Sequence, residues 1–322
     1  MKLTRIVNKR ALVVLAGALA LGAVLQFTDT NPAVSQTLSL TAPAVAEDPG
    51  LDPASKAWDG ISGVDVPLTA QTGTYAAGGG TVQTVNVRAL HYNGSMYFRV
   101  TWKDGTADQS TIRAEDFADA VALEFPAKSA ATVPSVCMGQ ADAGVNIWHW
   151  RADSNAGLKN PADVYANALV DGYPFLDSLF FTAREAKNPF ANPDLGPVQS
   201  LISQTFGELT TAATQDVAGL GARTTDGWSV VFSRPFQSVN VSYAEFAAGG
   251  RTDMAVAVWD GANDERNGRK SISQFITLSV SSSLAKDEGS KTWIVLAAVG
   301  MLMGLTAIGG GLAFYGYTQE RH

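Results

Sequence analysis

Residues 84–102 read TVNVRALHYNGSMYFRVTW, and they decide the fold class. Val85, Val87 and Ala89 alternate with polar residues, which is the period-two pattern of a half-buried β-strand. The dipeptide Asn93-Gly94 follows, and Asn-Gly favours a tight two-residue hairpin turn. The apolar run that begins at Met96 then returns as the partner strand. The stretch therefore predicts an antiparallel β-hairpin.

The same period continues along the chain and predicts an all-β protein. Short strand candidates separated by Gly- and Asp-rich turns are typical of an antiparallel β-sandwich. The stretch from Asn160 to Gln204 interrupts this rhythm, and we expect a long ordered excursion with short helices there. The further strand candidates are Ala120–Phe125, Val145–Arg151, Gly227–Phe232, Ala255–Trp259 and Phe275–Val280.

The two ends of the chain carry uncharged apolar runs. Basic residues precede the first run, which predicts a signal peptide or an uncleaved signal anchor. The second run is long enough to span a bilayer, and aromatic residues border it. We expect a cell-membrane protein whose main domain lies on the outer, periplasmic or extracytoplasmic face. The predicted parts are a signal peptide or anchor (1–27), a tether (28–56), the β-sandwich domain (57–280), a linker (281–292), a transmembrane helix (293–317) and a cytoplasmic tail (318–322).

Composition excludes several classes of protein. The single cysteine, Cys137, rules out an internal disulfide and a c-type haem attachment motif. Iron–sulfur clusters and thiolate zinc sites need several cysteines as well. A net charge of −7 provides no basic surface for nucleic acid.

An unusual motif centres on Met138. This thioether precedes Gly139, where the backbone can closely approach a flat macrocycle. A very aromatic strand, Val145–Arg151, follows it. A second motif, Trp259–Gly261 followed by the basic segment Glu265–Lys270, lies far downstream. Taken alone, Met138 is better explained as core packing, and Lys270 as a solvated lysine of a basic cluster.

Together these motifs resemble the haem-binding γ subunits of ethylbenzene dehydrogenase and its relatives, which belong to molybdenum enzymes of the dimethyl sulfoxide reductase family. The resemblance covers most of the range from Ala57 to Leu278. It implies one haem b whose iron is held axially by Met138 and Lys270. It also implies cofactor contacts by Asn146, Trp148 and Arg269, with Arg266 or Arg269 available to pair with the propionates. His149 is the rival iron ligand, because histidine is a common haem ligand.

The resemblance further implies a non-catalytic electron-transfer subunit. Its partners would be a molybdopterin catalytic subunit, an iron–sulfur subunit and a quinone-linked or cytochrome carrier. The alternative is a membrane-anchored carbohydrate-binding or structural β-sandwich module. For that reading, Trp102, Trp148, Trp150 and Trp228 would form an exposed sugar-binding platform.

An acidic stretch lies between the second and third strand candidates. It contains Asp104, Asp108, Glu115, Asp116 and Asp119. The spacing of an EF-hand is absent, so a solvated loop is favoured over a calcium site.

Overall fold

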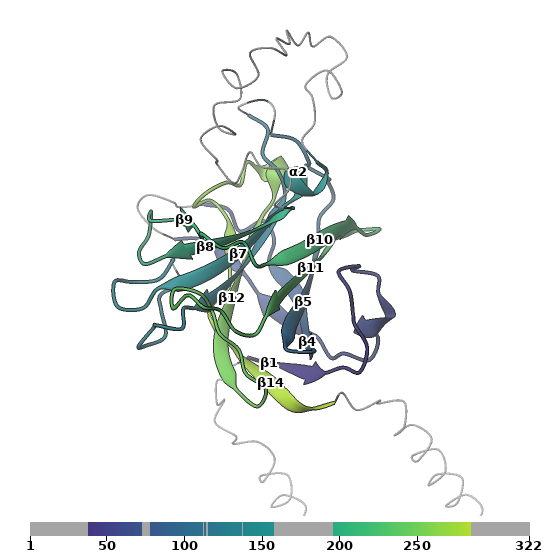
Figure 1. Ribbon diagram of the computed structural model, residues 1–322. Coiled ribbons are helices and arrows are strands. Elements are labelled where there is room, and N and C mark those ends of the chain that lie inside the picture. Colours follow the sequence, from purple (N-terminus) through teal and green to yellow (C-terminus); the bar gives the residue numbers. More distant parts are fainter. Residues whose placement is uncertain are drawn as a thin grey trace, which may run out of the picture. The chain divides into compact units, whose positions relative to one another are not determined.

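The computed structural model describes residues 38–72, 78–111, 113, 115–136, 138–157 and 196–284. These residues form strands joined by turns, with very little helix (Figure 1). The short helices are η1 (Lys56–Trp58), α2 (Ala152–Asn155) and η5 (Gly261–Asn263). The strands are β1 (Ser39–Ala44), β2 (Val64–Pro67), β3 (Thr69–Ala70), β4 (Thr84–Tyr92), β5 (Ser95–Lys103), β6 (Ala120–Pro126), β7 (Val145–Arg151), β8 (Val198–Ser203), β9 (Thr210–Thr211), β10 (Ala218–Arg223), β11 (Gly227–Pro235), β12 (Arg251–Trp259), β13 (Ser271–Ile272) and β14 (Ile276–Leu284).

The strands form a sandwich whose two sheets share β12. Along the main path the order is β10-β11-β5-β4-β1-β14-β12-β6-β7-β8-β9. The first half of β12, Arg251–Met254, pairs with β14 in one sheet. The second half, Ala255–Trp259, pairs with β6 in the other sheet. A single strand that changes partners midway therefore forms the corner of the sandwich (Figure 1).

All seven strand candidates from the sequence are confirmed as β4, β5, β6, β7, β11, β12 and β14. The predicted hairpin between β4 and β5 is confirmed too, with Leu90 opposite Tyr97 in the register. Asn93 and Gly94 both have positive φ, 45° and 74°, as a tight hairpin turn requires.

Strand β1 corrects two predictions. It lies within residues 28–56, which we expected to be a tether, and its Leu40 and Ala42 are fully buried. It also runs parallel to both β14 and β4, so the sheet is mixed rather than purely antiparallel. Alternation over six residues is a weak signal beside a segment rich in Ala, Pro, Ser and Thr.

The predicted excursion from Asn160 to Gln204 ends in strand β8, which pairs with β7. Its residues 160–195 lie outside the described part of the chain, as do the predicted signal peptide or anchor (1–27), transmembrane helix (293–317) and tail (318–322). Of the predicted linker (281–292), residues 281–284 belong to strand β14, and the rest lie outside the described part. Within the described residues, no helix is long and apolar enough to cross a membrane.

Aromatic side chains from both sheets fill the core. The Phe98 ring packs against Phe125 and Trp148 at centroid distances of 5.4 and 5.7 Å. Trp150 contacts Trp102 and Trp228 at 6.2 and 5.1 Å. The exposed sugar platform is therefore contradicted, because Trp102, Trp148, Trp150 and Trp228 are each at most 3% exposed.

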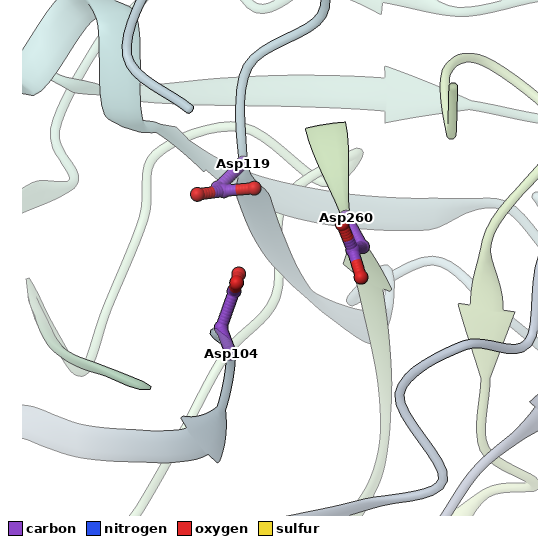
Figure 2. A group of neighbouring side chains, drawn as sticks. All are labelled: Asp104, Asp119 and Asp260. Carbon is purple, nitrogen blue, oxygen red and sulfur yellow. The ribbon is translucent and has the colours of Figure 1, made fainter. Parts of the chain in front are cut away.

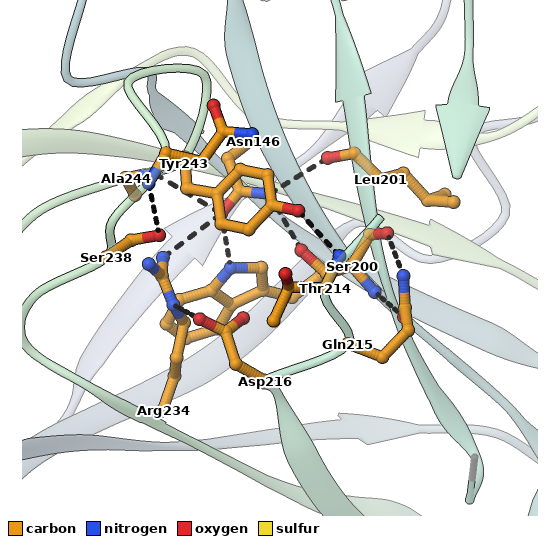
Figure 3. A network of polar contacts seen from close by, with 12 residues as sticks. Asn146, Ser200, Leu201, Thr214, Gln215, Asp216, Arg234, Ser238, Tyr243 and Ala244 are labelled. Carbon is orange, nitrogen blue, oxygen red and sulfur yellow. Dashed lines mark hydrogen bonds and ion pairs between the residues drawn. The ribbon is translucent and has the colours of Figure 1, made fainter. Parts of the chain in front are cut away.

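Asn146 is a polar hub inside this core (Figure 3). Its Oδ1 accepts hydrogen bonds from Trp148 Nε1 at 2.9 Å and from Arg234 Nη1 at 3.2 Å. Its Nδ2 donates to Ser200 Oγ and to the carbonyl of Leu201. One amide thus joins β7, β8 and β11 while satisfying buried donors that would otherwise be costly.

We expect Asn146→Ala to lower the free energy of unfolding by about 2–4 kcal/mol, because it leaves several buried groups without their partner. Denaturant unfolding followed by circular dichroism measures the change. Asn86→Ala is the matched control, since the Asn86 amide makes only an exposed bond to Asp65. The control should change stability by less than about 0.5 kcal/mol. Equal losses in both variants would contradict the assignment of Asn146 as a structural hub.

Candidate functional site

A large cavity lies against the sheet that contains β6, β7 and the second half of β12. It is on the face of that sheet that points away from the sandwich core. Its volume is about 720 Å³, within the range of about 300–1,000 Å³ typical of small-molecule sites. Strands β6, β7 and β12 form its floor. Segments around Phe117, Met138, Phe206 and Arg266 form its walls.

The floor is shaped by strand alternation. On β6 and β12 the residues that line the cavity are largely alanines, namely Ala120, Ala122, Ala255 and Ala257. Their neighbours Val121, Leu123 and Val258 point the other way and are buried in the main core. Small side chains on one face and large ones on the other leave a hollow above a firmly packed sheet.

Met138 reaches the cavity from a turn before β7. Its φ is +74°, a conformation that non-glycine residues rarely adopt and that commonly marks functional sites. Two contacts hold the turn: Ser203 Oγ donates to the Met138 carbonyl at 2.8 Å, and the Gly139 amide donates to the Ser135 carbonyl at 2.9 Å. Gly139 is required here, because its φ is +81° and a Cβ would lie 2.9 Å from the Ala143 carbonyl oxygen.

Lys270 lines the same cavity from the segment after β12. The residue is only 8% exposed, and its Nζ lies 5.1 Å from the centroid of the Trp259 ring. The backbone carbonyl of Lys270 accepts a hydrogen bond from the backbone N–H of Gln71 at 3.0 Å. Gly79 packs so closely that a Cβ there would clash with the Lys270 backbone nitrogen. The backbone beneath the amine is therefore fixed on two sides.

Two further ionisable groups face this hollow. Burial lowers the pKa of His149 to about 3, with Arg151 and Lys270 adding to the effect. Its Nε2 is buried and bonds to none of the described residues. Burial raises the pKa of Glu124 to about 8, and the nearby Lys270 opposes that shift. Sequence reasoning missed Glu124, although it is the one charged residue in the apolar strand β6.

The structure thus brings Met138, Lys270 and His149 to one cavity. It does not bring Asn146 and Trp148 there, because they lie on the opposite face of β7 and are fully buried in the core. Their predicted contact with the cofactor therefore has no support from this cavity. Arg269 is exposed and does not line the cavity, whereas Arg266 does, with its guanidinium 4.6 Å from the Phe117 ring centroid. Cys137 lies outside the described residues.

The chain belongs to the ethylbenzene dehydrogenase family, whose model matches residues 55–271. This match confirms the predicted family. It also spans the floor strands, the Met138 turn and the Lys270 segment, so the cavity lies within the part of the chain that defines the family.

Several relatives are similar over most of the chain. A protein named as a respiratory nitrate reductase heme subunit from Haloferax mediterranei is 30% identical over 72% of this chain and 68% of its own. The gamma subunit of chlorate reductase from Ideonella dechloratans is 29% identical over 71% of this chain and 79% of its own. The gamma subunit of dimethylsulfide dehydrogenase from Rhodovulum sulfidophilum is 28% identical over 59% of this chain and 58% of its own. The relatives are heme and gamma subunits of oxidoreductases, which confirms the prediction of a non-catalytic subunit.

Among solved structures, a family 9 carbohydrate-binding module from Caldicellulosiruptor kristjanssonii is similar with a TM-score of 0.40 and 8% identity. It covers 78% of this chain and 99% of its own. At that TM-score the likeness carries no argument about function.

Two substitutions in β12 test which of its residues face the cavity and which face the core. We expect Ala257→Leu to change the free energy of unfolding by less than about 1 kcal/mol, because the added atoms project into the cavity. Val258→Phe, one residue along and facing the filled core, should cost about 1–3 kcal/mol by overpacking. Urea unfolding of both variants measures the difference. A larger cost for Ala257→Leu than for Val258→Phe would contradict the orientation of this strand.

Proposed function

We propose that this chain is a haem b electron-transfer subunit of γ type within a membrane-anchored molybdopterin oxidoreductase complex. The observation that carries the proposal is the convergence of Met138 and Lys270 on one cavity, although the two residues are far apart in the sequence. The heme subunit among the relatives supports the same cofactor.

The donor set of the cavity fits a haem. A thioether, an amine and an imidazole face the same space, and each is a donor that iron accepts. The alanine floor supplies the flat apolar surface that a macrocycle needs. Arg266 at the wall offers a guanidinium for a propionate, which is a favourable charge-assisted pairing.

Lys270 would have to be neutral to bind iron, although the pKa of a free lysine is about 10.4. Burial in the cavity disfavours the charged amine. An ionised Glu124 would favour the charged amine. Burial keeps the pKa of Glu124 near 8, however, so most of this carboxyl is protonated at neutral pH. His149 remains the rival, since its ring is neutral and its Nε2 bonds to none of the described groups.

The haem would supply a one-electron redox centre, and a thioether ligand tends to raise the potential of such a centre. The chain's own part is to hold and shield it. Ala122 and Ala257 exclude water from below, and Trp259 and Phe117 cover the side walls. A centre held in a rigid sheet requires little reorganisation when its charge changes.

The proposed partners follow from the names of the relatives, which are subunits of nitrate, chlorate and dimethylsulfide oxidoreductases. A molybdopterin catalytic subunit and an iron–sulfur subunit would lie on one side of the electron path. A quinone-linked or cytochrome carrier would lie on the other. The predicted anchors at 1–27 and 293–317 support a membrane location with the domain on the outer face.

Optical spectra of the detergent-purified full chain, oxidised and then reduced with dithionite, test the proposal. We expect a Soret band and sharp reduced α and β bands. Met138→Leu keeps the apolar volume but removes the thioether, so we expect a change toward the spectrum of five-coordinate iron and at least tenfold weaker haem binding. Lys270→Ala should act similarly, whereas Arg269→Ala is the matched control and should leave the spectrum unchanged.

His149→Ala decides between the two nitrogen ligands. An unchanged spectrum supports Lys270, whereas loss of the sharp bands in His149→Ala but not in Lys270→Ala would reassign the ligand. Protein that is free of haem when made in haem-replete cells would overturn the proposed function as a whole.

A further inference from the structure

Three aspartates from separate parts of the chain meet beside the cavity (Figure 2). Asp104 follows β5, Asp119 precedes β6, and Asp260 follows β12. One carboxylate oxygen from each lies within 4.8 Å of the others. The acidic stretch was expected to be a solvated loop, but Asp104 is 6% exposed and Asp119 is fully buried. That expectation is wrong for these two residues.

The three carboxylates form no ion pair with a basic side chain in the part of the chain that the structure describes. Arg223 is close, but its Nη2 donates to the backbone carbonyl of Asp104 at 3.0 Å. Buried carboxylates need an ionic or hydrogen-bonding partner, so their accumulation without a basic side chain requires an explanation.

Two of the carboxylate oxygens lack a hydrogen-bond partner among the described residues. Asp104 Oδ1 accepts from the amide and hydroxyl of Thr106, but the buried Oδ2 bonds to none of the described groups. Asp260 Oδ2 accepts from Asn263 Nδ2, and its buried Oδ1 is likewise without a partner among the described residues. The Asp104 side chain is more than nine-tenths buried, and it points an acceptor oxygen without a described partner into the cluster (Figure 2).

The Asp119 carboxyl is held in place by three hydrogen-bond donors. Its Oδ2 accepts from the Asp108 amide at 2.8 Å and from Trp228 Nε1 at 2.9 Å. Its Oδ1 accepts from the Gly261 amide at 2.9 Å and keeps a further lone pair. Burial, with a contribution from the charge of Asp104, raises the pKa of Asp119 to about 7. Carboxylates this close together repel one another when ionised, and a cation bound between them relieves that repulsion.

We propose that Asp104, Asp119 and Asp260 bind one divalent cation, and that calcium is the ion that fits. The donors are all carboxylate oxygens, which suit hard cations and exclude a preference for zinc or copper. Calcium accepts irregular oxygen sites, whereas magnesium demands near-ideal octahedral geometry. The site stands on these residues alone and does not require a haem.

The position of the site gives it a role in the cavity. Asp119 precedes the floor residue Ala120 and follows the wall residues Phe117 and Ala118. Asp260 begins the segment that leads to Arg266 and Lys270. These two segments are packed so tightly that a Cβ on Gly261 would clash with the Phe117 carbonyl. A bound cation would fasten both walls to the end of β5.

Calcium titration of the purified, chelator-stripped full chain tests the proposal. We expect about one calcium per chain by calorimetry and by elemental analysis, with a higher Tm when calcium is present. Asp104→Asn and Asp260→Asn should each weaken calcium binding at least tenfold, because each removes a charged ligand without changing its size. Asp253→Asn, in the strand β12 that precedes Asp260 but outside the cluster, is the matched control and should bind as the unmodified chain does. Magnesium and zinc are titrated in parallel.

The Tm measured in chelator distinguishes a carboxylate that binds a cation from one that only stabilises the fold. Without calcium, Asp104→Asn should have a Tm equal to or above that of the unmodified chain, since it removes a buried repelling charge. A lower Tm of Asp104→Asn in chelator as well as in calcium would overturn the proposal. Failure of the stripped chain to bind calcium, or preference for magnesium or zinc, would overturn it too. The haem content of the same samples is measured separately, so failure of the cation site and failure of the haem site are distinguishable.

Discussion

The two-residue period of β7 is the constraint on which the rest of the structure depends. Asn146, Trp148 and Trp150 point into the core, while Ile147, His149 and Arg151 face the cavity. A slip of one residue would exchange the two sets and place the Asn146 hub in the cavity. The hydrogen bonds that Asn146 makes to β8 and β11 therefore fix which side of the sheet carries the site.

Strand β12 extends the same constraint to both sheets. Its first half belongs to the sheet of β14, and its second half completes the cavity floor with Ala255, Ala257 and Trp259. The large side chains that stabilise the fold thus lie on one face, and the residues available for chemistry lie on the other. Changes on the cavity face can alter the site without opening the core.

The fold class and most strands could be predicted from the sequence because period-two alternation is a local property. The hairpin at Asn93-Gly94 is the clearest case. Strand β1 could not be, since its parallel pairing with β14 joins opposite ends of the domain. Met138 and Lys270 entered through family resemblance, and only the fold could place them around one cavity. The position of Asn146 and Trp148 away from the cavity could not be predicted either. Strand alternation shows that neighbouring residues point to opposite faces of the sheet, but it does not show which face borders the cavity.

Buried polar groups in this protein differ in how fully the fold satisfies them. Arg234 is fully buried, yet Asp216 and Asn146 accept its hydrogen bonds and the Trp148 and Tyr243 rings lie beside it. Its Nη2, however, bonds to none of the described groups. His149 Nε2, Glu124 Oε1, Asp104 Oδ2 and Asp260 Oδ1 are buried without a bond to any described group. Such atoms also occur in the core, at Trp58 Nε1 and Trp102 Nε1 for example, so an unpartnered atom alone does not mark a site. Those at the cavity and in the carboxylate cluster lie beside other donor groups, which is why we propose ligands there.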